Sequence, residues 1–178
     1  MIRTLLWLFA GILLGALIHL VVILTLPLLT ETRTWDRLTA LGADRSIVVL
    51  DPVEPGAPNP MRLDPELVYG VCALDLTDKA GHLSGRMPLS FWSLSVYRQD
   101  GSVLYSTTNR EGASDRLRLG VFNAAQTIQL GRQEAEVEEG LNIVETDTNQ
   151  LAIVVRLAPP HPVMQARYRE IMSELDCS

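Results

Sequence analysis

The chain has 178 residues, of which 47% are hydrophobic and 20% are charged. This composition excludes a disordered chain and a collagen, and two cysteines are too few for a small disulfide-dense scaffold. The formal net charge is −6, and Arg3 is the only charged side chain among the first thirty residues. The rest of the chain is therefore still more acidic and would repel phosphate groups, so we expect no nucleic-acid partner.

Residues 5–29 form an apolar run that contains no charged side chain. As an α-helix this run would be about 37 Å long, at a rise of about 1.5 Å per residue, and would cross a hydrocarbon core of about 30 Å. We therefore expect residues 1–30 to be an uncleaved transmembrane anchor in the lipid bilayer. A secretory signal peptide is the alternative, but its apolar region usually has only about 7–15 residues. Thr30-Glu31-Thr32 is also a poor substitute for a small-x-small cleavage site.

Three residues inside the apolar run have more than one interpretation. Gly11 and Gly15 form a GxxxG pattern, which would let two helices approach closely and self-associate. In a segment this rich in Gly and Leu, the same pattern also arises by chance. His19 is the only ionisable group of the run, and a neutral, locally bonded imidazole is a simpler interpretation than a proton relay.

The basic residues near the two ends of the run barely decide its orientation. Arg3 lies on the short amino-terminal side, whereas Arg33 and Arg37 are interspersed with acidic residues on the other side. A short amino-terminal segment stays in the cytoplasm easily, and a long domain is translocated largely regardless of its charge. We therefore expect the domain that follows the anchor to lie outside the cytoplasm.

Residues 31–60 are predicted to connect the anchor to the main domain. A short helix is expected over residues 34–42, with Thr34 as its N-cap and Gly42 as its stop. A short strand follows at residues 46–50. Residues 51–60 contain four prolines and one glycine, which predicts a loop.

Residues 61–178 are predicted to form a mainly β domain of the α+β class. Trp92, Leu94 and Val96 alternate with polar residues, so we expect Trp92 to be a core residue. Because no helical crossovers separate the strands, we expect an antiparallel β-sandwich-like domain or a half-barrel. A helix from His161-Pro162 to Leu175 is expected to pack on the sheet. The expected strands in this domain are 68–75, 89–97, 102–106, 116–121, 127–130, 141–146 and 150–157.

Motifs for metal or cofactor chemistry are missing from the sequence. His82 and His161 are far apart, and there is no HExxH, CxxC, P-loop or dinucleotide-binding pattern, so we expect neither a metal nor a cofactor. Arg116 and Arg118 could bind an anion, although alternate charges on a half-exposed strand are more often solvated. The acidic segment 134–139 could bind calcium, but a solvated turn is the better interpretation, because the turn residues of a calcium loop are missing.

The only intrachain disulfide that the sequence permits joins Cys72 and Cys177. Closing a loop of about 100 residues would stabilise the fold by up to about 4–5 kcal/mol in the chain-entropy model. Cys177 lies next to a carboxyl terminus that we expect to fray, which favours two free thiols. The pairing therefore remains an open alternative.

Several stretches of the sequence match the pattern of one bacterial family. They are Asn59-Pro-Met-Arg-Leu-Asp-Pro-Glu-Leu-Val-Tyr69, Cys72-Ala-Leu-Asp-Leu76, Pro88-Leu-Ser-Phe-Trp-Ser-Leu-Ser-Val-Tyr97 and Ser106-Thr-Thr-Asn109. The chain thereby resembles membrane-anchored proteins of the domain-of-unknown-function family "twelve fifty-four", and the related family "twelve fourteen" has a similar F-W-S-L strand. The resemblance implies a mostly β domain in the cell envelope, on the periplasmic side of the inner membrane, without an assigned reaction. It also implies a separately encoded related protein as a candidate partner.

Two classes of function follow from these observations. We favour a non-enzymatic, membrane-tethered module that contacts another envelope protein, a glycan or a lipid. Its binding wall would be aromatic, formed by Tyr69, Phe91, Trp92 and Tyr97. The alternative is an envelope hydrolase or another enzyme with a carboxylate and histidine site at one end of the sandwich. The candidate site residues are Tyr69, Asp75, His82 and Asn109, with Asp78 as a further carboxylate, and they would need to converge in one pocket.

Overall fold

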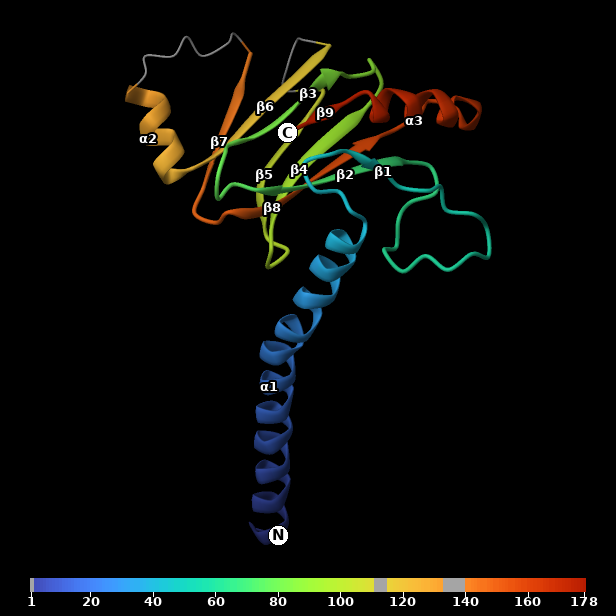
Figure 1. Ribbon diagram of the computed structural model, residues 1–178. Helices are drawn as coiled ribbons and strands as arrows, with labels where there is room; N and C mark the ends of the chain where they lie inside the picture. Colours follow the sequence, from blue (N-terminus) through green and yellow to red (C-terminus); the bar gives the residue numbers. More distant parts are fainter. Residues whose placement is uncertain (1, 111–114, 133–139) are drawn as a thin grey trace.

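The computed structural model describes residues 2–110, 115–132 and 140–178, without the side chains of residues 27–34 and 132. Figure 1 shows a β-rich domain from which one long helix, α1 (Ile2–Ala40), extends on one side. Residues 2–26 of this helix are long and apolar enough to cross a membrane, and none of them is buried against the domain. The apolar amino-terminal helix predicted from the sequence is thus confirmed.

Helix α1 continues beyond the apolar run, which corrects one prediction. A separate helix that begins at an N-cap Thr34 is wrong, because α1 runs through this position as far as Ala40. The segment between residues 30 and 34 contains neither Gly nor Pro, so nothing in it interrupts the backbone hydrogen bonds. The predicted stop is present, since Gly42 has a φ of 66° just after the helix.

In the described part of the chain, nine strands form two sheets in which antiparallel pairing dominates. The first, sheet A, has the order β1-β2-β8-β4-β5 and is antiparallel throughout. The second, sheet B, has the order β7-β6-β3-β9, and its β6–β7 pair is parallel. The strands of sheet A are β1 (Val48–Val49), β2 (Val68–Asp75), β4 (Trp92–Arg98), β5 (Val103–Thr108) and β8 (Gln150–Leu157). The strands of sheet B are β3 (Gly81–Arg86), β6 (Arg116–Asn123), β7 (Asn142–Thr146) and β9 (Asp176–Cys177).

Alternate residues of both sheets form one hydrophobic core. Leu94 and Val96 of β4 pair with Val155 and Ile153 of β8, and all four are completely buried. The same cluster includes Leu83, Leu119 and Val121 of sheet B. Trp92 belongs to this cluster and is only 7% exposed, which confirms its predicted place in the core.

The carboxyl-terminal helix packs against β2, as its apolar stripe predicts. A 3₁₀ turn, η1 (Pro162–Met164), begins at His161, and α3 (Gln165–Ser173) follows. Tyr168 and Met172 are the buried residues of α3. A Cβ atom at Gly70 of β2 would collide with Met172, so the glycine allows this close approach.

Two element predictions are wrong for local reasons. Residues 127–130 belong to a helix, α2 (Ala124–Arg132), and not to a strand. The Asn123 side chain accepts a hydrogen bond from the backbone N–H of Gln126, whose side chain accepts one from the N–H of Asn123. This reciprocal cap starts a helix where alternation alone had indicated a strand. Strand β3 was not predicted, because two glycines among six residues weaken its pattern.

The carboxyl terminus is fixed, and Cys72 forms a disulfide with Cys177. The expectation of a frayed end with two free thiols is therefore wrong. Strand β9 pairs with β3, and the backbone of Ser178 exchanges two hydrogen bonds with that of His82, at 2.7 and 2.9 Å. Because Cys72 lies in β2, the disulfide joins sheet A to sheet B.

Candidate functional site

The four candidate residues from the sequence lie in separate parts of the domain. Tyr69 and Asp75 are both on β2, six residues apart, which is about 20 Å along a strand. His82 lies on β3 of the other sheet, is exposed, and packs edge-on against Phe122 with ring centroids 5.7 Å apart. Asn109 follows β5, and its backbone N–H donates to the carbonyl of Trp92.

The strand register separates Asp75 from Asn109. Asp75 pairs with Gln150 at the start of β8, whereas Trp92, the neighbour of Asn109, pairs with Leu157 at its end. The two side chains thus lie at opposite ends of sheet A. The Asn109 amide donates to the Ser90 carbonyl at 3.4 Å, and its buried Oδ1 has no partner among the described residues.

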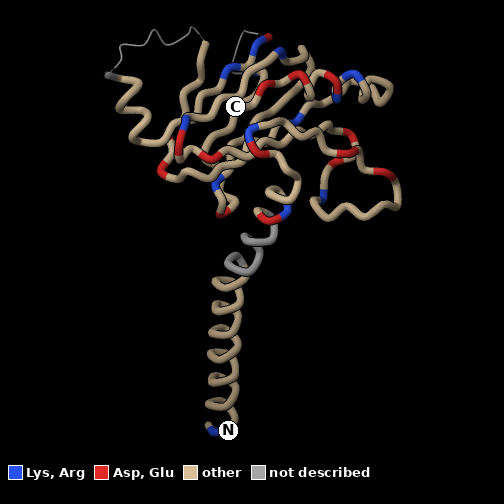
Figure 2. Tube along the Cα trace, viewed as in Figure 1, with Lys and Arg blue, Asp and Glu red and all other residues tan. Residues whose placement is uncertain are grey.

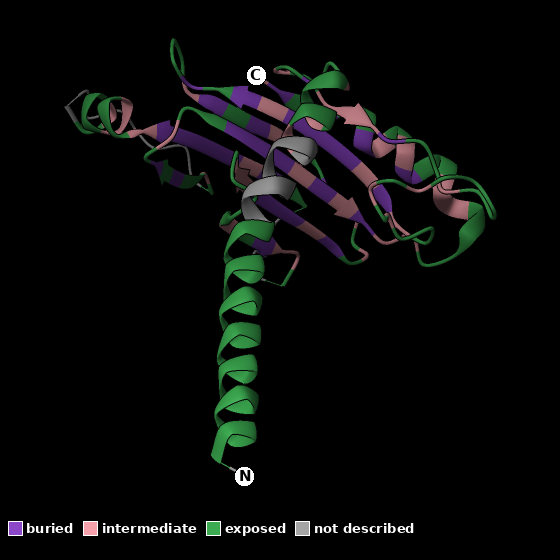
Figure 3. Ribbon diagram, turned by 90° about the horizontal axis from the view of Figure 1, so that it is seen from below, coloured by how far each residue is buried: buried purple, intermediate pink, exposed green. Residues whose placement is uncertain are grey.

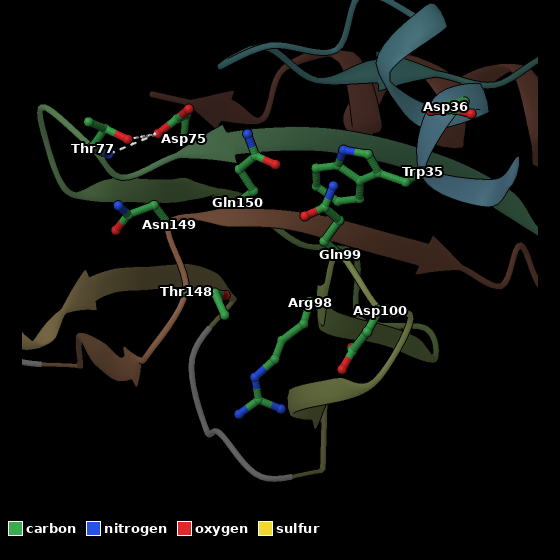
Figure 4. A pocket seen from close by; sticks show the side chains of 10 residues that line it. All are labelled: Trp35, Asp36, Asp75, Thr77, Arg98, Gln99, Asp100, Thr148, Asn149 and Gln150. Atoms are coloured by element: carbon green, nitrogen blue, oxygen red, sulfur yellow. Dashed lines mark hydrogen bonds between the residues drawn. The ribbon is translucent and has the colours of Figure 1, made fainter. Parts of the chain in front are cut away.

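Asp75 lines a polar pocket of about 610 Å³, shown in Figure 4. Its carboxylate accepts hydrogen bonds from the backbone N–H and the hydroxyl of Thr77, at 2.9 and 2.5 Å. These bonds lower the pKa of Asp75 below its usual range, so the carboxylate stays ionised. Arg98, on another side of the pocket, forms an ion pair with Asp147 at 3.3 Å. Both charged groups are thus already satisfied, and neither is suited to general acid catalysis.

The arginines of β6 line a different, smaller hollow. Arg116 and Arg118 line a hollow of about 360 Å³ together with Arg86, and neither residue is without an interaction partner. The acidic segment 134–139 lies outside the described residues. Among the described residues, no group of three or more His, Cys, Asp or Glu side chains could hold a metal ion.

A second pocket, which we call the α1 pocket, lies where helix α1 meets the domain. It has a volume of about 500 Å³ and lies between the end of α1, the proline-rich loop, the β4–β5 turn and the outer face of sheet A. Figure 1 shows the loop and the turn descending on either side of the end of α1. In Figure 3, which shows the molecule from below, the strands behind the domain end of α1 carry many buried and half-buried residues.

The walls of the α1 pocket are mostly apolar. Leu38 of α1 and Met61 and Leu63 of the loop pack around Val71 and Val154 of sheet A. Tyr69 and Tyr97, two members of the predicted aromatic wall, also line the pocket. The other two members do not, because Trp92 is in the core and Phe91 lies before β4.

The guanidinium group of Arg156 lies on the outer face of sheet A, among the apolar residues of the α1 pocket. In the register of sheet A, Arg156 is flanked by Tyr69 and Ser93. It donates hydrogen bonds to the Tyr97 hydroxyl at 2.9 Å and to the Ser95 hydroxyl at 3.3 Å. None of the salt bridges among the described residues involves Arg156. Its charge is thus held in place by neutral oxygens only.

The charged residues that line the α1 pocket are four arginines and one aspartate, a balance of +3 in a chain of −6. Arg37 donates to the carbonyl of Pro60 at 3.1 Å, and Arg62 is exposed beside it. Arg98 is the arginine that pairs with Asp147. Figure 2 shows an acidic and a basic segment side by side at the domain end of α1, where Arg37 follows Asp36. The pocket therefore combines apolar walls with excess positive charge.

Comparisons with known proteins give a likeness in fold alone. No protein-family model matches the chain, and no curated protein matches it. The VPA0106 protein from Vibrio parahaemolyticus is similar with a TM-score of 0.51 and 12% identity over 65% of this chain. The match covers only 28% of the Vibrio protein. An uncharacterised protein from Burkholderia cenocepacia gives a TM-score of 0.37 at 15% identity, over 79% of this chain and 46% of the other.

Proposed function

We propose that this protein is a membrane-anchored, non-enzymatic binding module whose ligand occupies the α1 pocket. The observation that carries this proposal is the place of Arg156, a guanidinium with no carboxylate partner among the described residues, in an apolar hollow at the base of the long helix. A pocket with apolar walls and a few fixed polar groups is the usual form of a ligand site. The two sheets and their shared core support a β-sandwich-like architecture, in which this pocket lies on an outer face.

The domain faces an oxidising compartment in this proposal. The disulfide between Cys72 and Cys177 supports it, because such bonds persist outside the cytoplasm and are rare inside it. The apolar helix supports a membrane anchor. Its place in the inner membrane, with the domain on the periplasmic side, is part of this proposal. The resemblance to the family "twelve fifty-four" agrees with an envelope protein, and a related envelope protein is a candidate partner.

An enzyme of the envelope is the weaker hypothesis. It needs Asp75, His82 and Asn109 in one place, and these residues lie at opposite ends and on different sheets of the domain. The carboxylate of Asp75 is held in its ionised form by Thr77. The candidate residues from the sequence therefore do not form a pair of nucleophile and base.

A photocrosslinking residue in the α1 pocket should capture the ligand in living cells. We expect a photoreactive phenylalanine analogue at Met61, a half-buried residue of the pocket wall, to give a crosslinked product. The matched control is the same analogue at Val163, which is 83% exposed on η1 and should give none. Mass spectrometry of the product identifies the class of ligand. Equal products at both positions, or none at Met61, would contradict the proposed function.

Fusion reporters should place the carboxyl terminus outside the cytoplasm. Because the backbone of Ser178 is paired with that of His82, each reporter follows residue 178 through a flexible linker. Alkaline phosphatase, which needs disulfides to be active, should show activity, and a fluorescent protein that matures only in the cytoplasm should stay dark. The opposite pattern would place the domain in a reducing compartment and overturn the periplasmic location.

A further inference from the structure

We infer that the ligand of the α1 pocket is an anionic phospholipid, with its phosphate on Arg156 and its glycerol and upper acyl chain against the apolar wall. This inference rests on the proposed function, since it names the ligand class of the same pocket. It accounts for two properties of the pocket together. The guanidinium matches a phosphate, and the neighbouring leucine, methionine and valine side chains match a hydrocarbon chain.

The geometry of Arg156 favours a phosphate ligand. The hydrogen bonds to Ser95 and Tyr97 hold the side chain on the outer face of sheet A. These two acceptors use only part of the five N–H donors of a guanidinium group, so other donors remain for a planar, two-pronged contact. A charge-assisted hydrogen bond is roughly twice as strong as a neutral one. Because Arg156 has no carboxylate partner among the described residues, it can form charge-assisted hydrogen bonds with an incoming anion.

The charge around the pocket selects an anionic over a zwitterionic lipid. Arg37 and Arg62 add positive charge at the rim, and Asp100 is the only acidic residue of the lining. Arg98 is neutralised by its ion pair with Asp147, so the lining keeps a local excess of +2 in a protein of net charge −6, which an anionic membrane would repel as a whole. Each basic residue near an anionic surface adds to the local attraction.

The position along α1 brings the pocket close to lipid headgroups. The apolar run ends at Leu29, and Arg37 follows eight residues later, about 12 Å along a helix. The headgroup layer covers about 5–7 Å of this height, and a tilt within the common range of about 0–40° lowers the pocket further. For an untilted helix, Arg37 at the rim of the pocket therefore lies about 5–7 Å above the headgroup layer.

Lipids that co-purify with the full-length chain test the inference. The protein is extracted from membranes in a mild detergent, and native mass spectrometry counts the phospholipids that stay bound. We expect the wild-type protein to retain one anionic phospholipid, such as phosphatidylglycerol, in preference to zwitterionic phosphatidylethanolamine. Arg156→Gln should reduce this occupancy by at least about tenfold, because a charge-assisted bond is lost. Arg156→Lys should lose less of the bound lipid than Arg156→Gln, since lysine keeps the positive charge but lacks the planar pair of donors.

The matched control is Arg167→Gln, which removes the same charge from an exposed position on α3 outside the pocket. It should retain the lipid as the wild type does. An excess of inorganic phosphate should leave the lipid bound, and its displacement would indicate a site for free phosphate instead. Equal lipid retention by Arg156→Gln and wild type would overturn the inference. A protein or glycan adduct at Met61 in the crosslinking experiment would also overturn it, while the proposed binding function would stand.

Discussion

Replacement of both Cys72 and Cys177 by alanine should lower the free energy of unfolding by about 4–5 kcal/mol. The disulfide closes a loop across a sequence separation of 105 residues, and in the chain-entropy model a loop of this size restricts the unfolded chain by about that amount. Both residues are buried, at 0% and 5% exposure, so alanine leaves no buried polar group. Urea unfolding of the full-length protein in detergent, followed by tryptophan fluorescence, measures the change.

Reduction of the wild-type protein provides the control for this prediction. A reductant should shift the urea midpoint of the wild type to that of the double variant and leave the double variant itself unchanged. A double variant as stable as the oxidised wild type would contradict the stabilising role. Because single domains are usually stable by only about 5–15 kcal/mol, the reduced domain would be marginal, and efficient folding would depend on an oxidising compartment.

Elements that follow a simple period were predictable from the sequence. In β8, the residues 151, 153, 155 and 157 face the core, and the period of two shows this directly. The apolar stripe of α3 likewise places Tyr168 and Met172 in the core. In both cases one face holds most of the buried residues, so the spacing of apolar residues along the sequence indicates that face.

Elements that depend on distant partners were not predictable in the same way. Strand β9 has only two residues, Asp176 and Cys177, and exists because β3 and the disulfide partner lie beside it. The parallel pairing of β7 with β6 depends on the path of the chain between them. The reciprocal cap of Asn123 and Gln126 was, however, visible in the sequence and could have indicated α2.

The candidate site was predictable only in part. The predicted aromatic wall included Tyr69 and Tyr97, and both line the α1 pocket, whereas Phe91 and Trp92 do not. Arg156 was missed, because its hydrogen-bond partners Ser95 and Tyr97 are 61 and 59 residues away. An arginine within an otherwise apolar strand, on the same face as tyrosines of the neighbouring strands, is the signal that could have identified it.

Trp92→Ala should unfold or nearly unfold the domain, since truncation of a buried aromatic side chain costs about 3–5 kcal/mol. Trp92 is 7% exposed and belongs to the core, where its strand neighbours Leu94 and Val96 are completely buried. The cavity that alanine leaves would lie between two sheets that the disulfide holds together, so little collapse can fill it. Limited proteolysis in native membranes and the urea midpoint in detergent both measure this loss of stability.

Trp7→Ala is the matched control for this substitution. Trp7 lies in the apolar part of α1 and is 76% exposed, so its removal should leave the stability of the domain unchanged. Trp92→Phe should be intermediate, because it keeps an aromatic ring and opens a smaller cavity. A Trp92→Ala protein with the urea midpoint of the wild type would mean that the inner face of β4 contributes little to the core. The stability of the domain would then have to come from the remaining strands and the disulfide, and the protease resistance of Trp92→Ala would be lost on reduction.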